Sequence, residues 1–336
     1  MSCMLARRGR SPEPDPLTTS VIMPTKNRPV FLAEAVRALL AQTTLPDELI
    51  VVDQSDDDRG RREVTALIAA LPAARRPRLI YVIDRSINGA AAARNIGFDR
   101  ATGDIVIGYD DDVVAEPGTI ERLLAHYRNA PDLAGLAPVI TNYPAPGRLL
   151  RLHRWLFTRG PFHDERQPVY WYWRRYPGPT RIPVRMFTGA MMSFRRTALD
   201  GIRHDARYRG ASVGEDIDLC WTIGRRGGRL AIVTDARIVH NRAPRPARRH
   251  EEAMIAAWGF LYRKHLPKTL GMRLAFAWYV TGVLVSSTVA ALSLKTLDPL
   301  RSARAGLRAL RTDFASSPFL SAGPIARWPR PCANLC

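Results

Sequence analysis

The chain is poor in cysteine and lacks the pattern of a secretory leader. Its four cysteines, Cys3, Cys220, Cys332 and Cys336, include no CxxC pair, so we expect no disulfide framework and a reducing compartment. The first residues, MSCMLARRGRSPEPDP, carry positive charge with no apolar stretch behind it. A secretory signal needs such a stretch, and export is therefore not expected.

Two phosphate-binding motifs are also missing. Neither GxxxxGKS/T nor GxGxxG stands near a predicted strand–helix junction. Because these glycine-rich loops bind phosphate groups at the start of a helix, P-loop and dinucleotide-binding functions are unsupported.

Lysine is scarce, although the chain is strongly basic. The 336 residues carry 50 basic and 31 acidic side chains, a formal net charge of +19, and only four of the basic residues are lysine. From Asn241 to the end there are 15 basic residues and 4 acidic ones. This excess predicts an anionic partner for the C-terminal part, either nucleic acid or a phospholipid surface. With 46% apolar residues, the chain suits one large globular domain or two ordinary ones.

Short apolar runs alternate with helical patterns in the first part of the chain. Strands are predicted at 20–23, 49–52, 79–83 and 105–109, and helices at 30–41, 64–71, 89–100 and from Pro117 onward. This order predicts an α/β fold with a mostly parallel sheet flanked by helices. Further strands are predicted at 186–194 and 230–233 and a helix at 214–227, while 148–185 is expected to be irregular.

One long uncharged run stands in the C-terminal third. Residues 274–294 are long enough for a helix of roughly 31 Å, close to the bilayer core of about 30 Å. Behind it, Arg301, Arg304, Arg308 and Arg311 share one helical face. A basic amphipathic helix beside an apolar one favours a membrane surface, and the alternative is a buried core helix followed by a solvated one. Whether 274–294 spans or lies on the membrane stays open.

Three consecutive carboxylates follow the strand predicted at 105–109. Alternation along a strand would place Asp110 and Asp112 on one side and Asp111 on the other. Two oxygen ligands on one side suit Mg²⁺ or Mn²⁺, which also bind substrate phosphates. A solvated acidic turn is the alternative.

Polar residues follow the first two strands as well. Asp53 and Asp56 come after the second strand, where a carboxylate can accept hydrogen bonds from a nucleobase or a ribose or cap the next helix. Residues 24–28, PTKNR, follow the first strand and either hold a nucleotide or form a helix entry.

Three more candidates lie on helices or after the last predicted strand. Arg94, in a helix of small residues, either neutralises a phosphate or stands exposed on a packed helix. Asp216, beside Glu215 in the first turn of a helix, either acts as a general base or complements the helix dipole. His240 is a third metal ligand, a phosphate contact or an ordinary loop histidine.

Five segments together resemble the inverting, nucleotide-sugar-dependent glycosyltransferases of family 2. They are SVIMPTKNR, ELIVVDQSDDD, NGAAAARNIGFDRATGDIVIGYDDDV, FTGAMMSFRR and GEDIDLCWTIGRRGG, and they run in the family's order from about residue 20 to 240. The resemblance implies the GT-A fold, a Rossmann-like sheet flanked by helices, and a divalent cation.

The resemblance also implies a role for each candidate residue. Pro24, Thr25, Arg28 and Asp53 would line the nucleotide pocket, with Asp53 facing the nucleobase. Asp110 would lie near the ribose, Asp112 would hold the metal, and Asp216 would be the base. Arg94, singled out above from its own helix, is expected at the nucleotide sugar as well. Where the family has Asp-Asp-Gly-Ser after the second strand, this chain has Asp53-Gln54-Ser55-Asp56. The QxxRW motif of processive synthases is missing, since the last glutamine is Gln167.

These observations lead to one hypothesis and two alternatives. We expect a disordered lead-in at 1–17, a GT-A domain at 18–245 and a basic, helical, membrane-associated region at 246–336. The expected activity is metal-dependent, non-processive, inverting transfer from a UDP-, GDP- or dTDP-sugar to a lipid-linked or surface-glycan acceptor, at the cytoplasmic face of the cell membrane.

The first alternative is a GT-A-like nucleotidyltransferase, for which the MPTKNR loop after the first strand is a poor match. The second is a non-catalytic basic protein that binds nucleic acid or membrane. It predicts a basic face on the sheet domain, where carboxylates cluster instead, so no nucleic-acid partner is expected.

Overall fold

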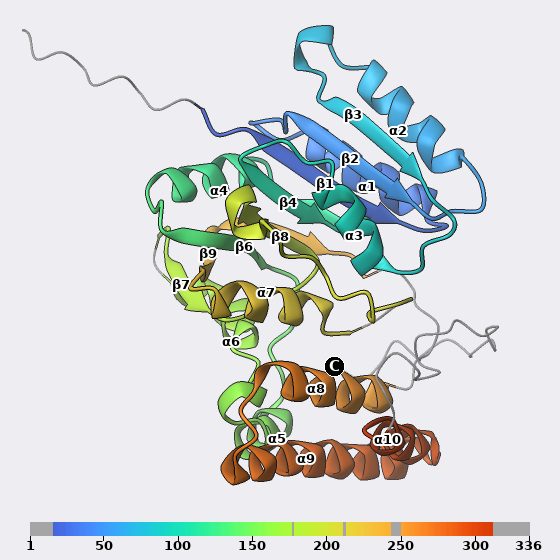
Figure 1. Cartoon of the computed structure of the whole chain (residues 1–336), viewed down its shortest axis with the longest axis vertical. Helices are drawn as coiled ribbons and strands as arrows, with labels where there is room; N and C mark the ends of the chain where they lie inside the picture. Colours follow the sequence, from blue (N-terminus) through green and yellow to red (C-terminus); the bar gives the residue numbers. More distant parts are fainter. Residues whose placement is uncertain (1–15, 177, 211–212, 243–249, 312–336) are drawn as a thin grey trace, which may run out of the picture.

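The computed structural model describes residues 16–176, 178–210, 213–242 and 250–311. The lead-in predicted at 1–17 therefore lies almost wholly outside the described residues, as do the tail beyond Arg311 and the predicted boundary at 245. We call residues 18–242 the sheet domain and the helices after it the C-terminal helices. Figure 1 shows the strands above and the C-terminal helices below them.

The first half of the sheet is parallel, as predicted. Its strands run in the order β3-β2-β1-β4, with β1 (Thr19–Thr25), β2 (Glu48–Asp53), β3 (Arg78–Ile83) and β4 (Ile105–Tyr109). Between them lie α1 (Pro29–Leu40), α2 (Arg59–Ala69) and α3 (Ala90–Phe98). Every residue of β1, β2 and β4 is buried, which explains why these strands have continuous apolar runs.

The second half of the sheet is mixed. The order continues β4-β8-β6-β9-β5, and β7 pairs with β9, with β5 (Val113–Ala115), β6 (Leu133–Ile140), β7 (Arg181–Val184), β8 (Met191–Arg195) and β9 (Arg229–His240). β4 and β6 both pair antiparallel with β8, while β6 and β9 are parallel. The sheet is thus parallel up to β4 and mixed beyond it, where we expected a mostly parallel one.

Several elements differ from their predicted limits. α4 (Thr119–Arg128) begins two residues after Pro117, and α7 is Glu215–Arg225. β8 begins later than the strand predicted at 186–194, and β9 continues far beyond 233. β6 was not predicted, because Gly135 and Pro138 interrupt its apolar pattern. The register with β9 shifts next to Pro138, as is usual where proline enters a strand.

The described residues of the segment 148–185 include two α-helices and a strand, so the prediction of an irregular connection is wrong. The segment contains α5 (Arg148–Phe157), α6 (Arg166–Tyr172) and the edge strand β7. α5 does not lie on the sheet but packs against α9, as Figure 1 shows. The local sequence, rich in tryptophan, proline and arginine, does not reveal a helix whose partner is more than 100 residues away.

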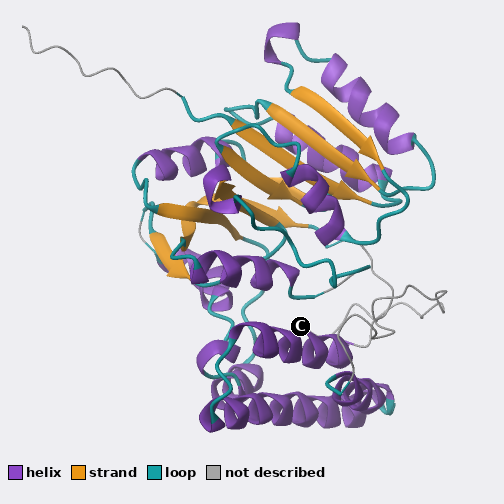
Figure 2. Ribbon diagram, viewed as in Figure 1, coloured by secondary structure: helices purple, strands orange, loops and turns teal. Residues whose placement is uncertain are grey.

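Between residues 250 and 311 the structure describes three helices: α8 (His250–His265), α9 (Leu270–Leu294) and α10 (Asp298–Ala309). α9 begins four residues before the predicted run, because the Thr269 hydroxyl accepts a hydrogen bond from Met272 N (3.3 Å) and caps it. α8 packs against α7 through Trp258 and Trp221, whose rings are 5.9 Å apart. Figure 2 shows this all-helical layer below the strands.

Candidate active site

The three aspartates lie in a turn between β4 and β5 rather than on a strand, because β4 ends one residue before Asp110. The alternation expected of a strand therefore does not apply, and the prediction that Asp111 points away from its two neighbours is wrong. Asp110 pairs with Arg94. Asp111 and Asp112 share Arg28 instead.

The loop after β1 holds the middle of this turn. Arg28 Nη2 lies 3.0 Å from Asp111 Oδ1, and Arg28 Nη1 lies 3.6 Å from Asp112 Oδ2. Thr25 donates a hydrogen bond to Asp111 Oδ2 (2.7 Å). Burial nevertheless raises the pKa of Asp111 to about 7, against the opposing effect of Arg28. Thr25 and Arg28 are thus gathered at the acidic turn, while Pro24 is buried within β1.

His240 meets Asp112 from the far end of β9. β9 pairs with β5 so that His240 lies opposite Val113, and this pairing brings His240 Nε2 to 3.2 Å from Asp112 Oδ1. The other ring nitrogen, Nδ1, is 2.9 Å from the hydroxyl oxygen of Tyr143. A hydrogen bond on one imidazole nitrogen fixes the direction of the other, so Tyr143 aims Nε2 at the carboxylate.

The predicted set of three metal ligands is not assembled. Within the described residues no group of three or more His, Cys, Asp or Glu side chains is placed to hold a metal ion, because Asp110 has turned to Arg94. Asp112 and His240 do fit part of such a site: an aspartate oxygen and an oriented imidazole nitrogen face each other. Mg²⁺ commonly takes only one or two protein ligands and completes its shell with substrate phosphate and water.

Arg94 joins the acidic turn to α7. Its side chain is 1% exposed, so the alternative of an exposed arginine is wrong. Nη2 lies 2.6 Å from Asp110 Oδ1 and donates to Gly189 O (3.2 Å), and Nη1 lies 3.5 Å from Glu215 Oε1. α3 approaches β1 closely enough for this because Gly97 has no side chain: a β-carbon there would lie 2.3 Å from a side-chain atom of β1.

Asp216 lies beside this network at the start of α7. Gly214, which precedes the helix, has a φ of +95°, a conformation that side chains other than glycine rarely adopt. Asp216 Oδ2 accepts a hydrogen bond from Gly189 N (3.0 Å) and lies 3.2 Å from Arg166 Nη1. Gly189 therefore contacts Arg94 through its carbonyl and Asp216 through its N–H. Burial, together with the charge of Asp216, raises the pKa of Glu215 to about 7.

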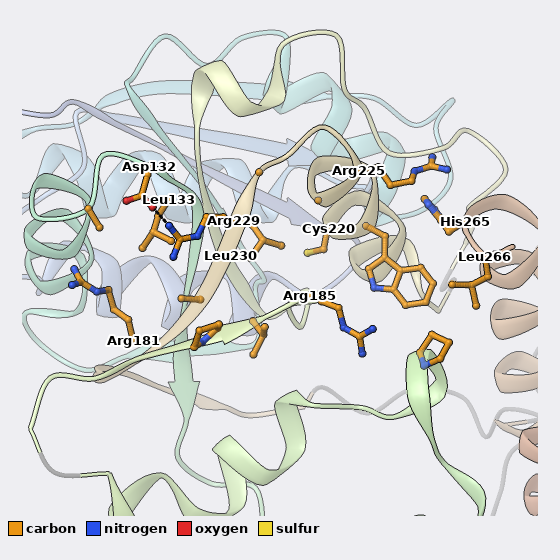
Figure 3. Close-up of a pocket in the computed structure, with 18 of the residues that line it drawn as sticks. Asp132, Leu133, Arg181, Arg185, Cys220, Arg225, Arg229, Leu230, His265 and Leu266 are labelled. Carbon is orange, nitrogen blue, oxygen red and sulfur yellow. Dashed lines mark hydrogen bonds and ion pairs between the residues drawn. The ribbon is translucent and has the colours of Figure 1, made fainter. Parts of the chain in front are cut away.

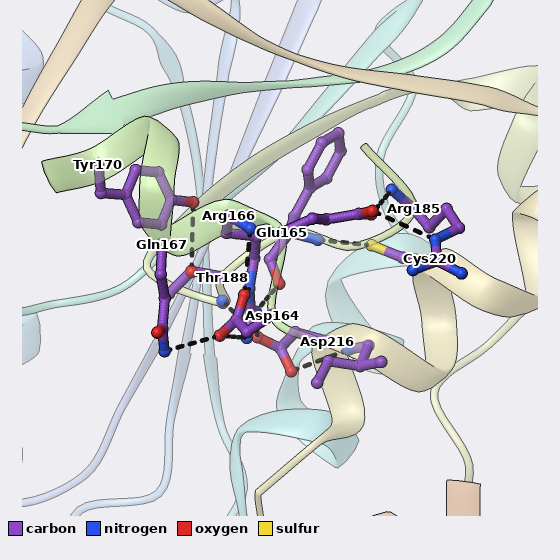
Figure 4. Close-up of polar contacts among 12 residues, drawn as sticks. Asp164, Glu165, Arg166, Gln167, Tyr170, Arg185, Thr188, Asp216 and Cys220 are labelled. Carbon is purple, nitrogen blue, oxygen red and sulfur yellow. Dashed lines mark hydrogen bonds and ion pairs between the residues drawn. The ribbon is translucent and has the colours of Figure 1, made fainter. Parts of the chain in front are cut away.

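Arg166 is a site residue that no sequence motif pointed to. It lies on α6, in the segment expected to be irregular, and Figure 4 shows it between Asp164 and Asp216. Asp164 accepts from Arg166 Nε (2.8 Å) and Nη2 (3.0 Å) in a two-pronged ion pair. Burial alone would lower the pKa of Arg166, but the Asp164 carboxylate outweighs it and the pKa is raised. Arg166 therefore stays charged beside Asp216.

Asp53 contacts a different set of residues. It accepts hydrogen bonds from the Tyr81 hydroxyl (2.6 Å) and from Ser55 N (2.8 Å), which join the end of β2 to β3 and to the next turn. Asp56, where the chain departs from the family pattern, has a structural role. Asp56 and Asn27 exchange two hydrogen bonds (2.9 and 3.0 Å). Both aspartates thus hold neighbouring strands and loops together, and neither contacts Arg94 or its partners.

A cavity of about 780 Å³ lies further along α7, between this helix and the strands β7 and β9 (Figure 3). Cys220, one helical turn after Asp216, is in its wall. Its sulfur accepts a hydrogen bond from Phe187 N (3.3 Å), and burial raises the pKa of the thiol. Cys220 is therefore a packed thiol and not an activated nucleophile.

Comparison with known proteins identifies the family. The model of glycosyl transferase family 2 matches residues 20–203. The chain belongs to this family.

Three curated relatives match parts of the chain. The galactofuranosyltransferase GlfT1 of Mycobacterium tuberculosis (strain ATCC 25618 / H37Rv) is 34% identical over 138 residues, 40% of this chain and 43% of the relative. The uncharacterized glycosyltransferase YwdF of Bacillus subtilis is 32% identical over 138 residues, 39% and 48% of the two chains. The putative colanic acid biosynthesis glycosyl transferase WcaA of Escherichia coli is 32% identical over 107 residues, 32% and 37%. Each match thus spans less than half of the relative's length.

Two solved structures share the fold. The mannosyltransferase PcManGT of Pyrobaculum calidifontis, crystallised with GDP-Man and Mn²⁺, has a TM-score of 0.56 at 17% identity and covers 89% of this chain and 88% of its own. S. aureus TarS 1–349 with UDP-GlcNAc has a TM-score of 0.57 at 14% identity, covering 88% and 80%. At these identities the likeness concerns the fold alone, and the predicted GT-A fold is confirmed.

Proposed function

We propose that this protein moves one sugar at a time from a nucleotide diphosphate sugar to an acceptor hydroxyl, with inversion at the anomeric carbon. One observation supports this above the others. Gly189 touches Arg94, which holds Asp110, and also donates to Asp216. The carboxylate expected to act as base thus lies beside the acidic turn expected to hold the donor.

The donor would bind at the acidic turn, between the ends of β1 and β4. Arg28 and Arg94, which pair with the aspartates of this turn, would supply positive charge to the diphosphate, and Asp110 would face the ribose. Asp112 and His240 would hold Mg²⁺ or Mn²⁺, a cation that stabilises negative charge on the departing diphosphate. Two structures that share the fold were determined in complex with GDP-Man and Mn²⁺ and with UDP-GlcNAc, which supports a nucleotide sugar as the donor class.

Asp216 would take the proton of the acceptor hydroxyl as it attacks the sugar. Gly189 N–H and Arg166 hold one carboxylate oxygen, Oδ2, from two sides, which fixes the direction of the carboxylate. A single displacement of this kind needs no protein nucleophile, in keeping with the packed state of Cys220. Base catalysis by a positioned group is typically worth roughly 10²–10⁴-fold in rate.

The acceptor would be lipid-linked or a growing surface glycan, met at the cytoplasmic face of the cell membrane. Relatives are named for galactofuranosyl transfer, for colanic acid biosynthesis and for glucuronosyl transfer to glucosyl-dolichyl phosphate. In this proposal residues 18–245 carry the chemistry, while the basic region 246–336 keeps the enzyme at the membrane.

Turnover of UDP-, GDP- and dTDP-sugars by the full chain, with Mn²⁺ or Mg²⁺, tests this proposal. We expect Asp216→Asn to lower kcat about 10²–10⁴-fold while the donor KM changes only a few-fold, because Asp216 contacts no part of the proposed donor site directly. Asp99→Asn, which removes an exposed carboxylate from the sheet domain, is the control and should keep full turnover. Undiminished kcat in Asp216→Asn would refute the assigned base.

A further inference from the structure

The exposed large apolar side chains of the described residues gather on two helices. α5 exposes Leu149, Leu150, Leu152, Trp155 and Leu156, and α9 exposes Leu270, Leu274, Trp278, Val285, Val289, Leu292 and Leu294. Apart from these, only Val30, Leu297 and Leu307 are exposed among the large apolar residues that the structure describes. Scattered exposed apolar residues are ordinary, but a contiguous patch marks an interface.

α5 and α9 form one surface, because they pack directly on each other. The indole N–H of Trp278 donates to Leu156 O (2.8 Å), and His153 Nε2 lies 2.9 Å from Gly282 O. Phe157 fills the space left by Gly282, where a β-carbon would lie 2.4 Å from it. The exposed side chains of the two helices therefore lie side by side, and we call them the α5–α9 face.

The charged residues of α5 and α9 themselves are all basic. Neither helix contains an acidic residue. Arg148, Arg151 and Arg159 stand exposed on and next to α5, and Arg273 near the start of α9. Apolar side chains bordered by arginine suit the boundary between acyl chains and anionic headgroups.

The connections of α9 decide how it meets a membrane. By length and composition it is able to span one, and its 25 residues make a helix of about 37 Å. However, α10 returns to α8: Glu252 N donates to Ser302 Oγ (3.1 Å), and a β-carbon at Gly306 would lie 3.0 Å from Ile255 Cβ. The helices on either side of α9 thus touch each other.

A spanning α9 would separate them. α8 is fixed to the sheet domain, since Lys264 Nζ lies 2.8 Å from Asp218 Oδ2. If α9 stood upright in a bilayer, α8 and α10 would lie on opposite sides of about 30 Å of hydrocarbon. We infer that α5 and α9 together lie flat in one leaflet, with the α5–α9 face buried among acyl chains of an anionic membrane. This inference rests on the membrane association proposed above.

Site-directed labelling distinguishes a flat helix from a spanning one. In the full chain with Cys3, Cys332 and Cys336 changed to serine, Lys268→Cys and Lys295→Cys place one thiol just before and one just after α9, while Cys220 stays buried. In sealed inside-out and right-side-out vesicles, a membrane-impermeant maleimide should label both positions from the same side. Labelling from opposite sides would overturn the inference.

A second measurement tests α5 itself. The double variant Leu149→Glu/Leu152→Glu replaces two apolar side chains of the α5–α9 face with charged ones. It should lower binding to vesicles containing anionic phospholipid at least tenfold. Both leucine side chains are more than half exposed, so the substitutions should leave the packing of the fold intact. Val30→Glu, an equally exposed apolar residue on α1, is the matched control and should bind as before.

Other outcomes would count against the α5–α9 face. Unchanged vesicle binding by the double variant, absence of any vesicle binding, or self-association through this face seen by sedimentation would each overturn it. Turnover of nucleotide sugars does not depend on these results. A chain that labels as expected but turns over no donor would refute the proposed function and leave the membrane inference standing.

Discussion

In the sheet domain two arginines of the active site are buried against carboxylates, whereas two arginines of α10, among the C-terminal helices, are exposed. Arg94 is 1% exposed and pairs with Asp110 and Glu215, and Arg166 pairs with Asp164 and Asp216. Arg304 and Arg308 are exposed. The same residue type thus pairs with buried carboxylates in one region and is exposed to solvent in the other. A net charge of +19 does not distinguish these uses.

The largest difference between the two regions should appear in stability. Arg94→Met leaves Asp110 and Glu215 buried without their cation, and breaking a buried pair in this way typically costs about 3–5 kcal/mol of unfolding free energy. Arg304→Met, on the exposed face of α10, should change it by no more than about 0.5 kcal/mol. Denaturant unfolding of both variants measures this. If the two variants lowered the unfolding free energy equally, burial would not distinguish the contribution of Arg94 from that of Arg304.

The parallel half of the sheet could be read from the sequence because its signal is local. β1, β2 and β4 are short, continuous apolar runs, each ended by polar residues, and α1 and α3 have clear helical spacing. The acidic turn, Arg94 and Asp216 could be singled out as candidates for the same reason: the acidic turn follows β4, Asp216 lies in the first turn of α7, and Arg94 stands among the small residues of α3.

The second half depends on partners distant in the sequence. β5 has only three residues and exists because β9 pairs with it. α5 packs against α9, and the local sequence of either helix does not predict that the other is its partner. Arg166 lies in this unpredicted segment, so its contact with Asp216 was missed. A clue was present in FTGA, where Gly189 reaches both Arg94 and Asp216, but which side chains meet there follows only from the tertiary structure.

A second prediction uses pH to test the acidic cluster. Burial raises the pKa of Glu215 to about 7, so between about pH 4.5 and 7 the folded chain holds a proton that the unfolded chain has released. Its contribution to stability is full below about pH 4.5 and is lost as the pH rises through 7. Glu215→Gln removes this titration, and the loss of stability between pH 5 and 8 should shrink by about 3 kcal/mol, the equivalent of the shift.

Unfolding midpoints measured across that pH range give the answer. Glu63→Gln, on the exposed surface of α2 beside Arg37, is the matched control and should leave the pH dependence as in the natural chain. If Glu215→Gln kept the same pH dependence, the proton would have to be on another group of the cluster.

The smallest expected effect concerns Tyr143, which acts on the site through His240. Tyr143→Phe keeps the ring but removes the hydroxyl that lies 2.9 Å from His240 Nδ1, so the imidazole loses the contact that directs Nε2 at Asp112. Loss of such a supporting hydrogen bond typically weakens metal binding about 10–100-fold. Calorimetric titration of Mn²⁺ into the full chain measures this without any need for turnover, and Tyr172→Phe, at a hydroxyl that contacts Arg151 on the surface, is the control. If Tyr143→Phe bound Mn²⁺ as tightly as the natural chain, His240 would not be a metal ligand. The cation would then be held by Asp112 and the diphosphate, and the positive charge around the acidic turn would come from Arg28 and Arg94.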